Sequence, residues 1–299
     1  MKVCVLISSY NGENYIEEQL QSIINQEGVE ADILVRDDGS TDRTDDILNA
    51  WQDEGKLKWY KGVNKGFALS FMDLLIHAEG YDYYAFCDQD DIWLPEKLGK
   101  AVAMLEAEDS DIKLYCSNTY LYKDGEIIGQ LHDSIPMFDK YTCLLRSITP
   151  GCTMVFNEHF RKLAASAPPK KIIAHDLWIY QIAMMTGKVI YDSTPSMLYR
   201  QHENNTIGQD SSLVLKKWKK RITFITIPEK RHEREDQVKE LMRCHSSSMS
   251  EESLSIARIV AGYRKSFKNR FNFIRDKRFT MGNATRDFYL KLRILFSLF

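Results

Sequence analysis

The chain has 299 residues, of which 44% are hydrophobic and 27% charged, and its formal net charge is -2. This composition is typical of a globular protein and excludes collagen-like, low-complexity and wholly disordered chains. No apolar run approaches the ~18 residues that cross a bilayer, and the six cysteines form no Cys-x-x-Cys pair. We therefore expect a cytoplasmic protein without a zinc site or a disulfide framework.

Charge is distributed unevenly along the chain. Residues 211–299 contain 21 Lys and Arg against 9 Asp and Glu, whereas residues 1–210 contain 19 against 33. Such a basic region suggests contact with an anionic surface, such as the cytoplasmic face of a membrane. The alternatives are that it packs on the acidic body or forms a homodimer. We expect no nucleic-acid partner.

The first part of the chain alternates strands with helices. Lys2–Ser8 is nearly all apolar, as expected of a strand buried on both faces of a parallel sheet. Apolar residues at positions 16, 20, 23 and 24 then share one face of a helix, for which Asn14 and Glu17 would form a capping box. The same alternation predicts strands over 31–36, 57–60 and 83–87, and helices around 47–51, over 66–77 and from Pro95 to about Glu106.

The pattern changes after residue 110. We predict a hairpin at Lys123-Asp124-Gly125 within a mixed region over 114–156, a helix over His175–Thr186, and short strands at Val189–Tyr191 and Met197–Tyr199. From residue 211 onward the pattern is helical. The elements together predict an α/β fold with a doubly wound, mixed sheet and a C-terminal helical, basic appendage. We expect the units to be 1–208, with halves 1–110 and 111–208, and 209–299.

Three carboxylates follow the strand over 83–87, in the sequence Asp88-Gln89-Asp90-Asp91. Carboxylate charges this close repel one another unless a cation or a hydrogen-bond donor neutralises them. Oxygen ligands of this kind suit Mg²⁺ or Mn²⁺, with substrate phosphates completing the coordination shell. The alternative is a solvated acidic loop in which Asp91 caps the next helix. Asp109-Ser110-Asp111 has the same spacing without this context and is the internal control.

Polar residues also follow the first two strands, at the strand ends where open α/β sheets bind ligands. Tyr10, in the loop Ser9–Gly12, is suited to stacking on a nucleotide base. A carboxylate of Asp37 or Asp38 is suited to accepting a hydrogen bond from a base or a ribose. Neither a phosphate-loop lysine motif nor Gly-x-Gly-x-x-Gly follows the first strand, which disfavours P-loop NTPases and nicotinamide-dependent Rossmann enzymes.

Two later segments contain further candidates. Asp176, in His175-Asp176-Leu177-Trp178, is either a catalytic carboxylate or an ordinary capping residue in a first helical turn. Tyr199-Arg200-Gln201-His202 ends the last strand, and its Arg and His either meet a diphosphate or belong to a surface loop. Spacing alone leaves both questions open.

Taken together, these segments resemble a family 2 glycosyltransferase of the GT-A fold. The resemblance covers residues 1 to about 205 in order. It rests on the motifs Ile7–Gly12, Arg36–Asp42, Asn64–Gly66 and Asp88–Asp91 followed by Pro95. A bacterial subgroup with many rhamnosyltransferases of surface-polysaccharide assembly is similar at Cys87–Trp93, His175–Trp178 and Tyr199–His202.

The sequence departs from the family pattern in two places. The usual Ala-Arg-Asn after Asn-x-Gly is Ala68-Leu69-Ser70 here, so no phosphate-binding arginine is assigned at that point. No Gln-x-x-Arg-Trp occurs, which excludes a processive synthase of the cellulose or hyaluronan type.

The resemblance implies roles for the candidate residues, and Asp176 would match the catalytic base. One set would bind the nucleotide: Ser8, Tyr10, Asn11, Asp37, Asp38 and Asp88. A second would hold Mg²⁺ or Mn²⁺ at the diphosphate: Asp90, Asp88 and His202. A third set is expected beside the acceptor or the diphosphate: Gly151, Cys152, Thr153, His175, Trp178 and Arg200.

These roles imply an inverting, metal-dependent transfer of a sugar from a nucleotide diphosphate sugar to a hydroxyl of a glycan or lipid-linked glycan. The subgroup favours L-rhamnose from dTDP-rhamnose as donor, and a UDP-hexose is the alternative. A sugar-phosphate nucleotidylyltransferase would need a Gly-rich, basic first loop, which Ser9–Gly12 is not. A non-catalytic sugar-nucleotide-binding protein is the remaining alternative.

Overall fold

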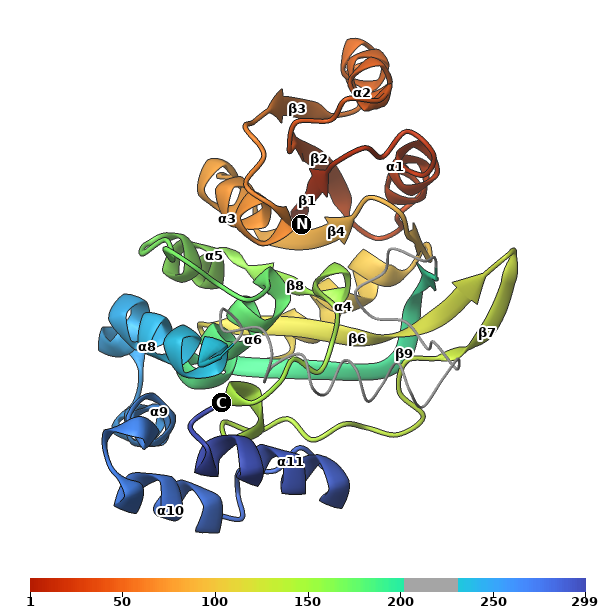
Figure 1. Ribbon diagram of the computed structural model, residues 1–299. Helices are drawn as coiled ribbons and strands as arrows, with labels where there is room; N and C mark the ends of the chain where they lie inside the picture. The colour runs from red at the N-terminus through yellow and green to blue at the C-terminus, as the bar shows by residue number, and fades with distance from the viewer. Residues whose placement is uncertain (202–230) are drawn as a thin grey trace.

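The computed structural model describes residues 1–201 and 231–299, and its strands form one mixed sheet (Figure 1). The strands are β1 (Lys2–Ser9), β2 (Glu30–Asp37), β3 (Lys58–Lys61), β4 (Tyr83–Asp88), β5 (Ile92–Trp93), β6 (Lys113–Lys123), β7 (Glu126–Gln130), β8 (Val155–Asn157) and β9 (Lys188–Arg200). Their order across the sheet is β3-β2-β1-β4-β8-β6-β9-β5, and β7 pairs with β6 as the predicted hairpin.

The strand directions bring the polar loops of the first half to one edge of the sheet. β1 pairs in parallel with β2 and β4, and β2 pairs in parallel with β3. In this register Ser8 lies beside Asp88, and Ser9 lies beside Asp37. β8 runs antiparallel between β4 and β6, whereas β9 is parallel to β6 and antiparallel to β5. The predicted mixed α/β sheet is confirmed.

Helices cover both faces of the sheet. The alternation along β1 illustrates this, because Val3, Val5 and Ile7 pack in one core, with α1, α2 and α4, and Cys4 and Leu6 in the other. The helices are α1 (Ile16–Ile24), α2 (Thr44–Asp53), α3 (Phe67–His77), α4 (Lys97–Glu106), α5 (Glu158–Ala165), α6 (His175–Thr186), α8 (Glu233–His245), α9 (Glu251–Ala261), α10 (Phe267–Arg275) and α11 (Ala284–Leu295).

Two local predictions were wrong. The capping box at Asn14 does not form: α1 begins after Tyr15, and the carbonyl of Gly12 accepts hydrogen bonds from the backbone N–H groups of Tyr15 and Ile16. The two short strands predicted after residue 188 are one continuous strand, β9. Its polar middle, Asp192–Ser196, coincides with irregular pairing to β6, where a proline is tolerated.

The described part of the basic appendage packs on the body mainly through apolar contacts, together with hydrogen bonds and an ion pair of 2.7 Å between Lys140 and Glu252 of α9. Apolar residues of α8 to α11, including Leu241 and Ile294, join the same core as α6. The Gln237 side chain of α8 donates a hydrogen bond of 2.8 Å to Gln181 of α6 and accepts one of 2.8 Å from the backbone of Ile173. Most basic residues in the described part of the appendage are exposed. No helix in the described ranges is long and apolar enough to cross a membrane.

Candidate active site

A cavity of about 740 Å³ opens at the carboxyl ends of β1, β2 and β4 and extends to the first turns of α6 and α8. This is the edge of an open α/β sheet at which ligands bind. Eight residues predicted from the sequence line it: Ser8, Tyr10, Asp38, Asp88, Asp90, Gly151, His175 and Asp176.

The loop after β1 is fixed by Gln89, the middle residue of the Asp-Gln-Asp motif. Its Oε1 accepts hydrogen bonds of 2.8 Å from the Ser9 hydroxyl and 2.9 Å from the Tyr10 N–H, and its Nε2 donates to the Tyr10 carbonyl at 3.1 Å. A side chain at Gly12 would clash, since its Cβ would lie 2.5 Å from Gln89 Oε1. The Tyr10 ring remains 48% exposed at the cavity, open to a stacking partner.

The two adjacent carboxylates after β2, Asp37 and Asp38, have different surroundings. Asp37 is fully buried and turns away from the cavity, where it accepts hydrogen bonds from the backbone of Gly39 and Ser40 at 3.0 and 2.8 Å. Asp38 lines the cavity but is held from behind by an ion pair with the buried Arg36. It also accepts hydrogen bonds from the N–H groups of residues 65 and 66, at 2.9 and 2.8 Å. Asp38 therefore shapes the loop before α3 as well as facing the cavity.

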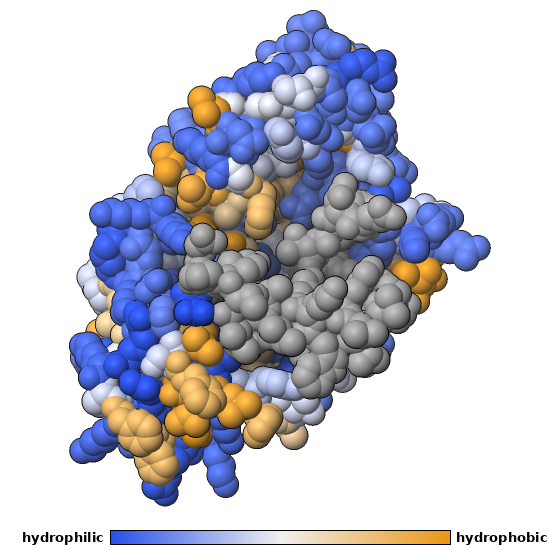
Figure 2. All heavy atoms as spheres, in the orientation of Figure 1, coloured by the Kyte–Doolittle hydropathy of each residue, from blue (hydrophilic) through white to orange (hydrophobic). Residues whose placement is uncertain are grey.

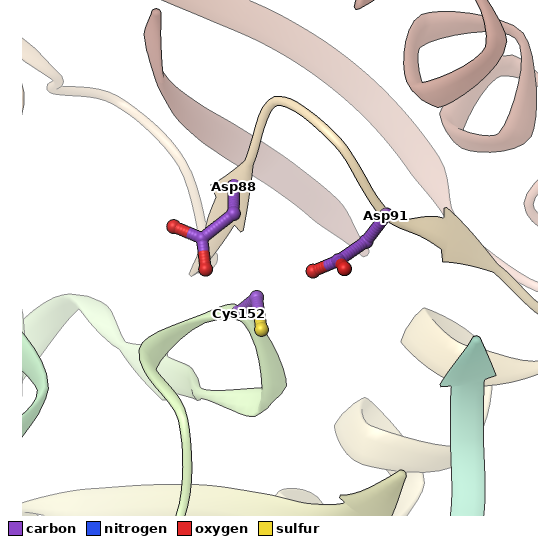
Figure 3. Close-up of side chains that lie close together, drawn as sticks. All are labelled: Asp88, Asp91 and Cys152. Atoms are coloured by element: carbon purple, nitrogen blue, oxygen red, sulfur yellow. The ribbon is translucent and has the colours of Figure 1, made fainter. Parts of the chain in front are cut away.

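The carboxylates after β4 form the most crowded group of charges. Ligand atoms of Asp88, Asp91 and Cys152 lie within 4.8 Å of one another, with both carboxylates directed toward the thiol (Figure 3). Burial, followed by the charge of Asp90, raises the pKa of Asp88 to about 7. The same causes raise the pKa of Asp91 well above its usual range. Without a cation, these carboxyls are therefore biased toward their neutral forms.

This donor set fits a hard divalent cation. Asp88 and Asp90 face the cavity, and the buried Oδ2 of Asp91 has no hydrogen-bond partner among the residues that the structure describes. Burial raises the pKa of the Cys152 thiol well above its usual range, so the sulfur remains protonated. A protonated thiol is a poor ligand for Mg²⁺ or Mn²⁺, which prefer carboxylate oxygens.

Arg200 organises this acidic loop from outside the cavity lining. Its backbone N–H donates to Asp91 Oδ1 at 3.0 Å, and its Nε donates to the carbonyl of Asp90 at 2.8 Å. A further ion pair of 2.5 Å joins Arg200 to Glu18 of α1. Its neighbour His202, predicted to bind the metal or the diphosphate, lies outside the described residues.

Asp176 reaches the cavity from the first turn of α6. Burial raises the pKa of Asp176, while the Leu177 N–H, the Ser147 hydroxyl and the charge of Arg234 act in the opposite direction. The charge of Asp176 in turn contributes to the raised pKa of Asp88, so the two carboxyls are within electrostatic reach. The carboxylate thus occupies a helix start, as the capping alternative requires, and also faces the cavity.

His175 holds this turn in place. Its ring stacks on Phe71 with 4.0 Å between centroids, and burial lowers its pKa to about 3, so it is neutral. A Cβ at Gly151 would lie 2.1 Å from His175 Nε2, which explains the glycine.

Several candidates lie outside the cavity lining. Asn11 accepts a hydrogen bond from the backbone of Thr41 at 2.9 Å, and Thr153 donates to the Pro150 carbonyl at 2.8 Å. Trp178 is fully buried in the core. Sequence reasoning missed Arg146, Ser147 and Arg234, which line the cavity near Asp176; the only signal for Arg234 was the positive charge of the C-terminal region.

Comparison with known proteins agrees with this architecture. A family model described as "Glycosyl transferase family 2" matches residues 4–164. A relative from Shigella flexneri named dTDP-rhamnosyl transferase RfbG is 34% identical over 242 residues, which is 73% of this chain and 83% of that protein. Escherichia coli WfaP, named a UDP-Glc:alpha-D-GlcNAc-diphosphoundecaprenol beta-1,3-glucosyltransferase, is 31% identical over 153 residues, 51% of this chain and 59% of its own length.

Solved structures show the same fold at lower identity. S. aureus TarS 1-349 in complex with UDP-GlcNAc has a TM-score of 0.56 at 18% identity, covering 99% of this chain and 80% of that one. The mannosyltransferase PcManGT from Pyrobaculum calidifontis, in complex with GDP-Man and Mn2+, has a TM-score of 0.52 at 17% identity, covering 99% and 85%. The fold is that of GT-A glycosyltransferases, and the chain belongs to glycosyltransferase family 2.

Proposed function

We propose that the protein is an inverting transferase that moves a sugar from a nucleotide diphosphate sugar to a hydroxyl of a glycan acceptor in bacterial polysaccharide synthesis. The best-supported donor is dTDP-L-rhamnose, because the Shigella flexneri relative named for that activity matches over most of both chains. A UDP-hexose is the second candidate, favoured by the name of WfaP. The same name supports an acceptor glycan linked to a polyprenyl diphosphate.

One observation carries the proposal: Asp176 opens into the cavity that Asp88 and Asp90 also line. Asp176 takes the proton of the attacking hydroxyl, and burial raises its pKa above that of an ordinary aspartate, which makes its carboxylate a stronger base. The hydroxyl oxygen forms a bond to the anomeric carbon as the bond to the diphosphate breaks, so the anomeric configuration is inverted. His175, which is neutral, keeps the Asp176 turn in place without competing for the proton.

Asp88 and Asp90 are the residues that would hold Mg²⁺ or Mn²⁺, whose chemistry is to stabilise the negative charge that develops on the departing diphosphate. Asp91 and Arg200 position their loop from behind. Tyr10 offers an aromatic face to the nucleotide base at the cavity.

The test is a panel of dTDP- and UDP-sugars with purified protein, in which release of the nucleoside diphosphate is measured with and without acceptor glycans. Transfer from one donor to an acceptor, with the product anomer opposite to that of the donor, is the expected result. Asp109→Asn is the matched control for Asp176→Asn, since Asp109 lies outside the cavity. Binding of a nucleotide sugar without any turnover would instead identify a sugar-nucleotide-binding protein.

We also propose that the appendage attaches the enzyme to the cytoplasmic face of a membrane, where a lipid-linked acceptor would be presented. Hydrophobic residues gather on the surface over α10 and α11 (Figure 2). Phe267, Phe271, Phe288 and Phe296 are all at least 49% exposed there. Exposed basic residues, such as Lys268 and Lys291, lie on the same helices. Aromatic side chains beside basic ones favour an anionic interface.

Vesicle flotation tests this attachment. The protein should float with vesicles containing an anionic phospholipid at low salt, and a Phe271→Ser, Phe288→Ser double variant should remain at the bottom of the gradient. If the wild-type protein also fails to float and elutes as a dimer in size-exclusion chromatography, the face joins two copies instead.

A further inference from the structure

Two arginines line the cavity together with Asp176. Arg146 lies after the short helical turn Thr142–Leu144, and Arg234 lies in the first turn of α8. Both line the cavity together with Ser147, and Ser147 and Arg234 act directly on the Asp176 carboxyl. By contrast, the charges that act on Asp88 are those of Asp90 and Asp176.

Each arginine has one buried nitrogen without an acceptor among the residues that the structure describes. Within the described ranges, 1–201 and 231–299, the buried Nη1 of Arg234 and the buried Nε of Arg146 have no hydrogen-bond acceptor. Burial, followed by the charge of Arg293, lowers the pKa of Arg234 to about 10, and burial with Arg286 lowers the pKa of Arg146. A buried donor on a cation costs free energy when it has no acceptor, so these two nitrogens are suited to an anionic ligand in the cavity.

We propose that Arg146 and Arg234 form a subsite for a phosphoryl group of the acceptor, beside the base Asp176. The inference rests on the proposed transferase function and specifies its acceptor as an anion, of the phosphoryl or diphosphoryl class. Guanidinium groups match phosphate oxygens in geometry and charge.

The negative charge of the cavity explains why an anionic acceptor would need such a subsite. An acceptor with a phosphoryl group would approach Asp176, Asp88 and Asp90, all of which repel it. Arg234, whose charge acts on Asp176, and Arg146, which lines the same cavity, would offset this repulsion. A neutral glycan would need no such groups, and Arg234 would then only lower the basicity of Asp176.

The binding test uses inorganic pyrophosphate in the presence of EDTA, which prevents pyrophosphate from binding through a divalent cation. Calorimetry should detect binding to the wild-type protein, and Arg234→Gln and Arg146→Gln should each weaken it about 10- to 100-fold, the loss typical of one charged hydrogen-bonding group. Arg258→Gln, a matched change on the exposed surface of α9, should leave the affinity unchanged. Equal binding by all four proteins, or no binding by the wild type, overturns the subsite.

Two further measurements separate the donor from the acceptor and the subsite from the fold. A nucleoside diphosphate added in EDTA should not displace pyrophosphate; displacement would assign the arginines to the donor. Thermal unfolding of Arg234→Gln in the absence of ligand should occur at the wild-type temperature or above, because an unsatisfied buried charge is removed. A lower temperature would indicate a structural role, and Arg234→Lys, which keeps the charge, should then restore stability.

Two acceptors with the same glycan test whether the phosphoryl group that binds the subsite belongs to the acceptor. One carries a diphosphate at its reducing end and the other a neutral alkyl chain. Arg234→Gln should raise KM at least tenfold for the diphosphate form and leave KM for the neutral form unchanged. An equal rise for both would overturn the subsite. Absence of transfer by the wild type to either acceptor would count against the transferase function, whereas the pyrophosphate result stands independently of it.

Discussion

The cavity collects like charges in two places, and the two differ in how they arise. The carboxylates Asp88, Asp90 and Asp91 are neighbours in the chain, whereas Arg146 and Arg234 come from distant segments. In both places burial biases groups toward neutrality, raising the pKa of Asp88 and lowering that of Arg234. Each place is suited to a ligand of opposite charge, a cation in the first and an anion in the second.

The loss of a carboxylate from the loop Asp88–Asp91 should cause the largest loss of transfer activity. Asp90→Ala should remove nearly all transfer activity, since it deletes an oxygen ligand at the cavity. EDTA should abolish transfer, and Mn²⁺ or Mg²⁺ should restore it. Asp109→Ala, at the same spacing outside the cavity, should retain wild-type activity in the same assay. Full activity in EDTA would remove the metal from the mechanism.

A smaller but more specific loss is expected at Asp176. Asp176→Asn cannot accept a proton at neutral pH, so kcat should fall about 10²–10⁴-fold, the usual contribution of a general base. Donor affinity, measured by calorimetry, should change little, whereas Asp90→Asn should weaken cation-dependent nucleotide binding as well. Since Asn caps helices nearly as well as Asp, a variant with wild-type turnover would reduce Asp176 to a capping residue.

Stability should distinguish a satisfied buried arginine from an unsatisfied one. Arg36 is paired with Asp38 and Asp73, so Arg36→Gln should lower the free energy of unfolding by about 3–5 kcal/mol, because a buried carboxylate loses its partner. The same change at Arg234 should leave it equal or higher. Chemical denaturation of the two variants, side by side, measures the contrast. Equal losses would mean that Arg234 is as well satisfied as Arg36.

The pH dependence of kcat/KM should reflect the pKa of Asp176 and the charge of Arg234. Burial raises the pKa of Asp176 above its ordinary 3.8, so the acid limb should lie at higher pH than for an exposed aspartate. Activity is lost as pH falls through this pKa, because the base becomes protonated. Arg234 favours the charged carboxylate, so Arg234→Gln should displace the acid limb to still higher pH. An unmoved limb would separate Arg234 from the base.

The sequence predicted best those features that are formed by residues close together in the chain. The run Asp88–Asp91 after a buried strand was enough to predict an acidic loop at the sheet edge, and parallel pairing brings Ser8 beside it. Asp37 and Asp38 could not be told apart, because their difference lies in the hydrogen bonds of the turn that follows.

Contacts between distant elements could not be predicted. Arg234 comes within electrostatic reach of Asp176 only when α8 packs against α6, and no pattern in either segment records that packing. Likewise, the polar stretch Asp192–Ser196 suggested a break between strands, whereas pairing with β6 carries β9 through it.

The glutamine contact between α6 and α8 joins the C-terminal appendage to the body of the enzyme. Gln237 links the segment before α6 to Gln181, and Gln181 Nε2 donates to the carbonyl of Cys143 at 3.1 Å. Helix α6, which carries Asp176, is thereby joined to helix α8, which carries Arg234. Helix α6 and the appendage should therefore unfold together as one cooperative unit, although the family model ends at residue 164. An exchange of appendages between relatives would alter the acceptor end of the cavity while leaving the nucleotide end intact.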